Sequence, residues 1–545
     1  MLKKALLLCF FMNEKQPIYI MPENVSRTLG RDAQRNNILA AKIVSDIVKT
    51  TLGPRGMDKM LVDATGNIIV TNDGVTILEE MEIDHPAAKM MVEIAKTQES
   101  EVGDGTTTAA ILGGELLQKA EGLLDRKIHP TVIVKGYRLA ADKALELLNE
   151  LSFPVENKTV LKQIAMTAMT GKGAEGHKEK LANIIVEAIE QIAQGREVNL
   201  ENVKLQKIKG DGIGDSELIS GIVIDQEKAN AAMPSKIEGA RILLTDAALE
   251  LRNPETEAKI SVSTPEQLES FIFSEEKRLK DMTDIIITSG ANVVFCQKGI
   301  DDVAQYYLAK AGILAVRRVP RSDMEKIARA TSGTIVSNLD DISVEQFGTA
   351  ELVEQSKSGD ENLLYIRGCK NPMAVTIVIR GGTTHVIDES ERAIKDGLGD
   401  VASSIKSGKV VAGGGAVEME LSKRLRAFAK TIGGREQLAI EVFANALESI
   451  PEALAENAGM DAIDVLTELR KMHEAGKANY GLNLFNDMIE DTFAAGIIEP
   501  IKVKVQAISS ASEFAMMILR IDDILVSKSS KQGNMPMGNP YAGMD

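Results

Sequence analysis

The sequence predicts a multidomain protein, with a mostly α-helical domain built from both chain ends and a mixed α/β insertion between them. The chain has 545 residues, too many for one core, because domains typically contain about 100–200 residues. Apolar residues recur at three- and four-residue spacing towards both ends, as on amphipathic helices. Short strand-like pieces alternate with helices between residues 203 and 336, as in α/β domains. The simplest arrangement is that the two ends fold together and the middle is inserted.

The composition is that of an ordinary globular protein, and it argues against several classes of partner. Hydrophobic residues make up 44% of the chain, and the formal net charge is −16. Nucleic acids and anionic membranes bind basic surfaces, so this charge argues against either as the main partner. No apolar run is long enough to cross a bilayer. Three widely spaced cysteines form neither a disulfide framework nor a metal-binding pattern, which favours a reducing, cytoplasmic location.

Both termini are predicted to lie outside the folded domains. Two lysines precede a short apolar run over residues 5–12, which imitates a signal peptide but lacks a small-residue cleavage site. We therefore expect residues 1–21 to be a poorly ordered extension that begins at an upstream start codon, with Met12 or Met21 as the true start. Residues 528–545 are rich in Ser, Gly, Pro and Met, lack periodicity, and are expected to be disordered.

The first third of the chain has the pattern of helices joined by glycine-rich turns. Apolar periodicity predicts helices over residues 27–52 and 85–96, and long helices from residue 106 to residue 151. Residues 68–70 predict a short strand, and the Asn-Asp-Gly sequence at 72–74 predicts a turn of the hairpin kind.

The rest of the chain changes character twice. A predicted helix over residues 178–194 is followed by strand-like pieces, among which a charged amphipathic pattern over 264–282 predicts a helix with a solvated face. The pattern is mostly helical again over residues 416–474 and 507–519. The predicted strands cover residues 203–208, 222–224, 241–244, 285–288, 293–295, 313–316, 334–336, 374–380, 410–411 and 501–505.

One short stretch, Gly103-Asp104-Gly105-Thr106-Thr107-Thr108, has the clearest chemical character. Glycines let the backbone turn tightly and approach a ligand. The threonines lie where a helix begins, and free N–H groups at a helix N-terminus bind phosphate. Asp104 would repel a phosphate unless a hard cation such as Mg²⁺ lay between them. The stretch therefore indicates a nucleotide–Mg²⁺ cradle, although a polar turn that caps a helix would use the same residue types.

Other short Gly and Asp elements are scattered along the chain, and each has an ordinary structural explanation. Asp73 fits an Asx turn, Asp396 a helix surface, and Lys172 an exposed loop. The glycine triplet at 413–415 fits a flexible linker, and Glu499 fits the entry to a strand. The sequence contains no Walker A, GxSxG, HExxH or kinase signature. Only the order of these elements, taken together, points to a shared function.

In order and sequence, these elements resemble the group II chaperonins, and most closely the archaeal, thermosome-type subunits. The resemblance extends from residue 22 to residue 526. The segment at 275–282 (EEKRLKDM) is similar to the family's helical protrusion, which acts as a built-in lid. The other matching motifs are TLGPRGMDKML at 51–61, VTNDGVTIL at 70–78, EVGDGTTT at 101–108, AGMD at 458–461 and LRIDD at 519–523.

The resemblance implies ATP and Mg²⁺ as cofactors and gives each matching residue a role. Asp104 would hold Mg²⁺, and Lys172 would sense the γ-phosphate. Asp73 and Asp396 would position and activate the attacking water. Because Asp396 lies far from Asp104 in the sequence, we expect its segment to swing in by a domain movement. The residues implied to contact the nucleotide are Gly105, Thr106, Thr107 and Thr108 at the phosphates, and Leu52, Gly53, Pro54, Gly413, Gly414, Gly415, Gly481, Asn483 and Glu499 elsewhere.

The resemblance also implies a fold and an assembly. It implies a mostly α-helical equatorial domain, a small α/β intermediate domain, and an α/β apical domain with a helical lid around residues 264–282. Like subunits would form a double ring with about eight subunits per ring, as a homo- or hetero-oligomer. The implied boundaries are 22–156 and 413–527 for the equatorial domain, 157–228 and 377–412 for the intermediate domain, and 229–376 for the apical domain.

The implied activity is ATP hydrolysis that closes the lid around unfolded or partly folded proteins. Two alternatives remain open. One is a ring scaffold or holdase that hydrolyses ATP weakly, against which the intact Asp73, Asp104 and Asp396 argue. The other is an unrelated Mg²⁺–nucleotide enzyme with a small substrate, which predicts no large ring.

Overall fold

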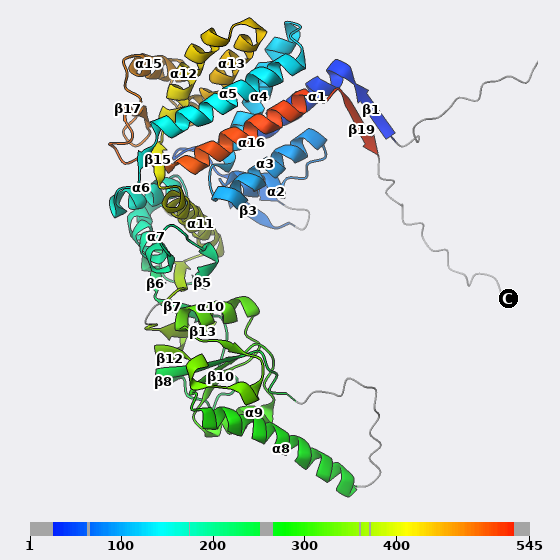
Figure 1. The fold of residues 1–545 in the computed structure, drawn as a ribbon, viewed down its shortest axis with the longest axis vertical. Coiled ribbons are helices and arrows are strands. Elements are labelled where there is room, and N and C mark those ends of the chain that lie inside the picture. The colour runs from blue at the N-terminus through cyan, green and yellow to red at the C-terminus, as the bar shows by residue number, and fades with distance from the viewer. Residues whose placement is uncertain are drawn as a thin grey trace, which may run out of the picture.

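The computed structural model describes residues 25–62, 66–173, 175–250, 265–358, 361–369 and 372–527. The molecule is elongated, and three blocks follow one another along its longest axis (Figure 1). We call them the helical block, the connecting block and the sheet block. The expected N-terminal extension and the expected disordered tail lie outside the described residues.

The helical block is built from both ends of the chain around one hydrophobic core. Tyr137, Phe443 and Phe514 come from distant segments, and all three are almost fully buried in this core. The rings of Tyr137 and Phe443 pack edge to face, with centroids 5.6 Å apart. The helices of the block are α1 (Gly30–Lys49), α2 (Gly74–Glu80), α3 (Pro86–Val102), α4 (Thr106–Asp125), α5 (Pro130–Leu151), α12 (Ala416–Ile432), α13 (Gly434–Leu447), α14 (Ser449–Asn457), α15 (Ala462–Glu474) and α16 (Ile501–Leu519).

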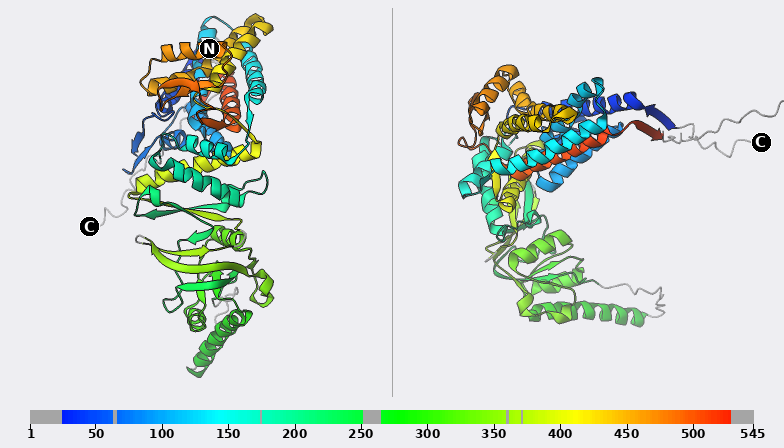
Figure 2. Two further views of the ribbon diagram at one scale, coloured as in Figure 1. Left: turned by 90° about the vertical axis from the view of Figure 1, so that its left-hand side faces the viewer. Right: turned by 45° about the horizontal axis from the view of Figure 1, so that its top comes forward.

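Small sheets border the helical block. Strand β1 (Val25–Leu29) pairs antiparallel with β19 (Asp523–Ser527), so the two ends of the described chain lie together (Figure 2). Two hairpins follow, β2–β3 and β16–β17, and β15 lies between β18 and β4. Their bounds are β2 (Lys59–Val62), β3 (Ile68–Thr71), β4 (Phe153–Pro154), β15 (Lys409–Ala412), β16 (Tyr480–Asn483), β17 (Met488–Asp491) and β18 (Ile498–Pro500).

The connecting block packs three helices on a small sheet. Strand β14 (Val375–Gly381) is the central strand, parallel to β5 (Val203–Lys209) and antiparallel to β6 (Glu217–Ile219). The core contains buried branched side chains from all parts of the block. The helices are α6 (Lys158–Met169), α7 (Lys178–Ile192) and α11 (Thr384–Ser407).

The sheet block contains a seven-stranded mixed sheet flanked by helices. Helix α8 (Pro265–Ser289) extends from this block as one long helix (Figure 1). Leu279 and Ile286 anchor α8 in the core, whereas Phe273 is 69% exposed further out. The strands, in sheet order, are β10 (Leu314–Val316), β9 (Val293–Cys296), β8 (Lys236–Thr245), β12 (Gly348–Ser358), β13 (Glu361–Arg367) and β7 (Gly221–Ile224), with β11 (Ile335–Val336) beside β8. The flanking helices are α9 (Asp302–Lys310) and α10 (Arg321–Thr331).

Three local predictions from the sequence are wrong. Residues 285–288 belong to α8, and residues 501–505 begin α16, where strands were expected. Residues 285–288 are a short apolar run, and residues 501–505 alternate lysine with branched apolar residues. Over so few residues, neither pattern distinguishes a strand from one face of a helix. The Asn-Asp-Gly sequence at 72–74 does not form a hairpin turn, because Asp73 is the N-cap of α2. Among the described residues, no helix combines the length and apolar character that crossing a membrane requires.

A buried ionic cluster joins α12 to α15 in the helical block. Glu420 Oε2 lies 2.8 Å from Nδ1 of His473, and Arg424 Nε donates to Glu420 Oε1 at 2.8 Å. His473 Nε2 lies 2.8 Å from the carbonyl oxygen of Tyr480. Burial alone would raise the pKa of Glu420, but these contacts outweigh burial and lower its pKa to about 2.

We expect this cluster to stabilise the protein except in strong acid. Since the pKa of Glu420 is depressed on folding, its contribution is complete above about pH 4.5 and is lost as the pH falls through about 2. The Glu420→Gln variant should lose about 2–3 kcal/mol of unfolding free energy at pH 7 and little at pH 2. Urea titrations at the two pH values measure this loss. The exposed Glu468→Gln variant on α15 should change stability by less than about 0.5 kcal/mol at both; equal losses for the two variants would contradict the assignment.

Candidate functional site

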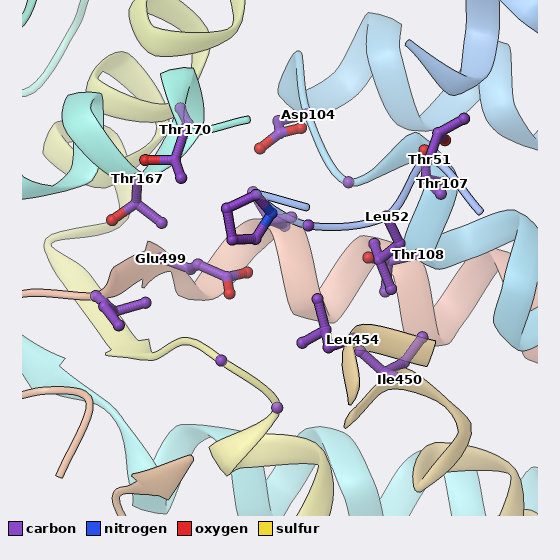
Figure 3. Close-up of a pocket in the computed structure, with 18 of the residues that line it drawn as sticks. Thr51, Leu52, Asp104, Thr107, Thr108, Thr167, Thr170, Ile450, Leu454 and Glu499 are labelled. Carbon is purple, nitrogen blue, oxygen red and sulfur yellow. The ribbon is translucent and has the colours of Figure 1, made fainter. Parts of the chain in front are cut away.

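A pocket lies where the helical block meets the connecting block (Figure 3). Thr167 and Thr170 border it from α6, Leu454 and Ile450 from α14, and Glu499 from β18. Of the residues that the sequence singled out, thirteen line it: Leu52, Gly53, Pro54, Asp73, Asp104, Gly105, Thr106, Thr107, Thr108, Lys172, Gly414, Gly415 and Glu499. Segments from both chain ends therefore meet at one cavity.

The predicted cradle forms the N-terminus of α4. Gly105 is the N-cap in a left-handed conformation (φ 81°), and no side chain caps this end of the helix. The N–H groups of the first turn therefore remain available to an anionic ligand. The preceding turn is held by Gln98, whose Nε2 donates to the Asp104 carbonyl oxygen at 2.8 Å. The end of α4 is thus a rigid, uncapped cradle of the kind that binds phosphate.

Helix α2 packs directly against this cradle. A Cβ atom on Gly74 would lie 2.6 Å from Oγ1 of Thr107, so only glycine allows this approach. Asp73 Oδ2 accepts hydrogen bonds from the backbone N and Oγ1 of Thr76, at 2.9 and 2.6 Å. Asp73 therefore caps α2, where the sequence predicted a turn, and also borders the pocket.

Lys172 and Asp396 form an ion pair across the connecting block. Their side chains are only 16% and 17% exposed. The Lys172 loop is held by Asn72, whose Nδ2 donates to the Gly171 carbonyl oxygen at 2.7 Å. Burial outweighs the attraction of Lys172 and raises the pKa of Asp396. Although burial opposes it, the charge of Asp396 raises the pKa of Lys172.

Asp396 is therefore already beside the site in this conformation. Lys172 lines the pocket and contacts Asp396 directly. The expected swing of the Asp396 segment is therefore not required to bring Asp396 beside the pocket. The turn of α11 near Asp396 packs closely on the cradle. A Cβ atom on Gly399 would lie 2.9 Å from the Val102 carbonyl oxygen and 3.2 Å from Cα of Gly103.

Asp400 is a pocket residue that the sequence reasoning missed. It follows Asp396 by one helical turn on α11, lines the pocket, and is 2% exposed. Its Oδ1 atom is buried and has no hydrogen-bond partner among the described residues. Burial, and then the charges of Asp104 and Asp396, raise the pKa of Asp400 well above its ordinary value. The four-residue spacing from Asp396 was the available signal.

Lys504 is a second residue that was missed. It lines the pocket from α16 and is 5% exposed. Its Nζ atom lies 2.8 Å from Oε1 of Glu418 and 2.6 Å from Oε2 of Glu499. Lys504 therefore fixes the Glu499 carboxylate beside the pocket. The positive charge of Lys504 is therefore already paired with two carboxylates.

Four predicted residues do not line the pocket: Asp396, Gly413, Gly481 and Asn483. Asn483 Nδ2 donates to Glu490 Oε1 at 2.6 Å, so this amide closes the β16–β17 hairpin. Gly481 supports the wall, since a Cβ atom there would lie 2.8 Å from the Gly414 carbonyl oxygen. The apolar part of the wall was not foreseen; its side chains include Ile450, Leu454, Leu482, Leu484 and Phe485.

The lining matches a nucleotide with a hard cation better than a metal centre built from protein ligands alone. No group of three or more His, Cys, Asp or Glu suited to a metal occurs among the described residues. Mg²⁺ is commonly held by one or two carboxylates together with phosphate oxygens, and Asp104 is placed next to the phosphate cradle. The apolar wall suits a base, and the cradle suits a phosphate chain.

The cradle glycine gives a direct test of this geometry. In the Gly105→Ala variant, the new Cβ would lie 2.6 Å from Val503 Cγ1 at a positive φ, at a cost of about 1–3 kcal/mol. We expect nucleotide affinity to fall about tenfold, measured by calorimetric titration. Gly122→Ala is the matched control on the same helix, since nothing lies within 4 Å of its Cβ. The control should bind like the parent chain; equal affinities for both variants would contradict a phosphate role for the α4 N-terminus.

Comparisons with known proteins agree with this geometry. Residues 44–529 match the family model described as the TCP-1/cpn60 chaperonin family. The chain is 54% identical over 528 residues to thermosome subunit alpha of Archaeoglobus fulgidus, which covers 96% of this chain and 97% of that protein. It is 54% identical over 517 residues to a thermosome subunit of Methanopyrus kandleri, which covers 94% of this chain and 95% of that protein.

A third relative, thermosome subunit beta of Methanothermobacter thermautotrophicus, is 54% identical over 528 residues, covering 96% of this chain and 98% of that protein. These matches confirm the resemblance that the sequence motifs indicated. The chain belongs to the TCP-1/cpn60 chaperonin family, in its group II, thermosome-type branch, whose ATPase activity drives protein folding in a double-ring chamber.

Proposed function

We propose that the pocket between the helical and connecting blocks binds ATP with Mg²⁺, and that its hydrolysis closes helix α8 over an unfolded protein. One observation carries the proposal: the uncapped N-terminus of α4, Asp73 and Asp104 line a single cavity, and Asp396 pairs with Lys172 of the same lining. Phosphoryl transfer requires positioning and charge neutralisation more than covalent participation by the protein.

The cradle would bind the phosphates through the backbone N–H groups and hydroxyls of residues 105–108. Asp104 would hold Mg²⁺, which when bound neutralises phosphate charge. Asp73, which lines the same pocket at the start of α2, would orient the attacking water. Leu52, Gly53 and Pro54, with the 413–415 segment and Glu499, would enclose the rest of the nucleotide.

The Lys172–Asp396 ion pair supports a link between phosphate binding and catalysis. Lys172 contacts Asp396 and holds it as an ion pair. A γ-phosphate that reached Lys172 would offer the ammonium another anionic partner. Asp396 would then be free to accept a proton from water, as a general base within hydrogen-bond reach. Lys172 would thus act as the γ-phosphate sensor.

The three blocks correspond in this proposal to the equatorial, intermediate and apical domains, with the boundaries predicted from the sequence. Helix α11 contributes Asp396 and belongs to the connecting block, so hydrolysis at the pocket would act directly on that block. The exposed Phe273 on α8 supports a lid role, because it offers apolar surface to a lid neighbour or a client. Like subunits, about eight per ring, would complete a chamber in the cytoplasm.

Three measurements on the purified full-length protein test this function together. We expect Mg²⁺-dependent phosphate release, double rings in negatively stained electron micrographs, and ATP-dependent recovery of a chemically denatured client enzyme. Rings that bind the client without phosphate release or recovery would indicate a holdase or scaffold. Phosphate release from particles that form no ring would indicate an enzyme with a small substrate. Either of these two outcomes would contradict the proposal.

A further inference from the structure

We propose that Asp400 is a second cation ligand of the nucleotide site, which joins the bound metal to helix α11. This inference rests on the proposed function of the pocket. It assigns the cation a carboxylate from the connecting block in addition to Asp104 from the helical block. The metal would then tie the two blocks together.

One carboxylate oxygen of Asp400 is buried and unpaired among the described residues. Asp400 is 2% exposed and lines the pocket, and its Oδ1 atom has no hydrogen-bond partner among the described residues. A buried carboxylate without a partner is costly, because a charged group loses its hydration and gains nothing in return. Such a group is retained when a ligand supplies the missing partner.

The positive charges that line the pocket are paired with acids other than Asp400. Two lining residues carry a positive charge, Lys172 and Lys504. Lys172 is engaged by Asp396, and Lys504 is engaged by both Glu418 and Glu499. Each lysine of the lining is therefore already paired with another acid, and the attraction of Lys172 does not offset the burial of Asp400. A hard cation is the ligand type that both satisfies a bare carboxylate and accompanies a nucleotide.

Helix α11 lies close to the segment that precedes Asp104. The Gly399 backbone packs so closely on the 102–103 segment that a Cβ atom there would lie 2.9 Å from the Val102 carbonyl oxygen. Asp104 follows this segment and Asp400 follows Gly399; both line the pocket, and their charges interact. Two carboxylates completed by phosphate oxygens and water match the usual environment of protein-bound Mg²⁺.

Mn²⁺ provides a direct probe, because the free ion is measured by electron paramagnetic resonance. The titration uses the full-length protein saturated with ADP. We expect Asp400→Asn to weaken Mn²⁺ binding at least tenfold, in the range found for residues that support a metal. The matched control is Asp388→Asn, earlier on the same helix and outside the pocket lining, which should bind Mn²⁺ like the parent chain.

The asparagine variant also distinguishes a metal-binding Asp400 from a protonated Asp400 that only donates a hydrogen bond. A protonated Asp400 would donate a hydrogen bond, and an asparagine amide can do the same. A loss of Mn²⁺ affinity smaller than tenfold would therefore overturn the inference. The Asp104→Asn variant distinguishes this failure from a wider one: if it loses Mn²⁺ and Asp400→Asn does not, the proposed function stands and only the role of Asp400 falls. Unchanged Mn²⁺ binding in both variants would reject the proposed metal site itself.

Thermal unfolding provides a second readout that needs no activity. In EDTA, Asp400→Asn should melt at a higher temperature than the parent chain, because the variant removes an uncompensated buried carboxylate. Addition of Mg²⁺ and ADP should raise the melting temperature of the parent chain more than that of the variant. The opposite order in EDTA, or an equal gain on adding Mg²⁺ and ADP, would overturn the inference.

Discussion

Replacing Asp396 by alanine is expected to keep ATP affinity within about threefold of the parent chain and to lower turnover about 10²–10⁴-fold. The Asp396 carboxylate is paired with Lys172 and does not itself line the pocket, so the nucleotide loses little direct contact when the carboxylate is removed. The reaction, however, loses the group placed to accept a proton from water. Equilibrium binding of a fluorescent ATP analogue and single-turnover phosphate release measure the two quantities separately.

The Asp396→Asn variant sharpens this test, because it keeps the shape of the side chain and removes only the base. Since the pKa of Asp396 is raised, the carboxylate becomes protonated at a higher pH than an exposed one. Turnover of the parent chain should therefore fall as the pH decreases from about 8 to about 6, and the residual turnover of Asp396→Asn should lack that fall. Asp388→Asn, on the same helix, is the control. Equal losses of affinity and turnover would contradict a catalytic role.

Replacing Asp104 by asparagine is expected to affect both binding and chemistry. Without this carboxylate the cation loses its protein ligand at the cradle, and metal ions supply several kcal/mol of charge stabilisation in such reactions. Turnover should fall about 10³-fold or more, and the Mg²⁺ concentration needed for half-maximal activity should rise.

Phosphate release measured across a Mg²⁺ series checks this expectation. The control is Asp125→Asn at the other end of α4, where the side chain is exposed and paired with Arg35. Hydrolysis by Asp104→Asn with an unchanged Mg²⁺ requirement would show that the metal is held elsewhere. Of Asp104 and Asp396, only Asp104 should change the Mg²⁺ dependence when it is replaced, which distinguishes the roles of the two acids.

The phosphate cradle could be predicted from its residues because its chemistry lies in one short local stretch, whereas the other candidate site residues came from the resemblance. The cradle at 103–108 is indicated by glycines, an acid and hydroxyls at the start of a predicted helix, and the structure places it at the N-terminus of α4. Helices with a regular apolar stripe, such as α5 and α12, were equally accessible. These features depend on neighbours within a few residues.

The parts that could not be predicted depend on distant partners. In the sequence, Asp400 is indistinguishable from an exposed acid on a helix. Only the fold, in which α11 lies against the 102–103 segment, brings Asp400 to the pocket. Lys504 is one of two lysines that alternate with apolar residues over 501–505, and only the fold places Glu418 and Glu499 around it. Strand β12 was missed because its largely polar sequence carries no continuous apolar run, and its pairing with β8 and β13 is a long-range property.

The most direct test of the account is an electron cryomicroscopy structure of the full-length protein with Mg²⁺, ADP and aluminium fluoride. The account predicts the phosphates at residues 105–108, a cation in contact with Asp104, and the carboxylate of Asp396 beside the fluoride. Nucleotide density in another cavity, or an Asp396 side chain directed away from the fluoride with Lys172 still its partner, would contradict it.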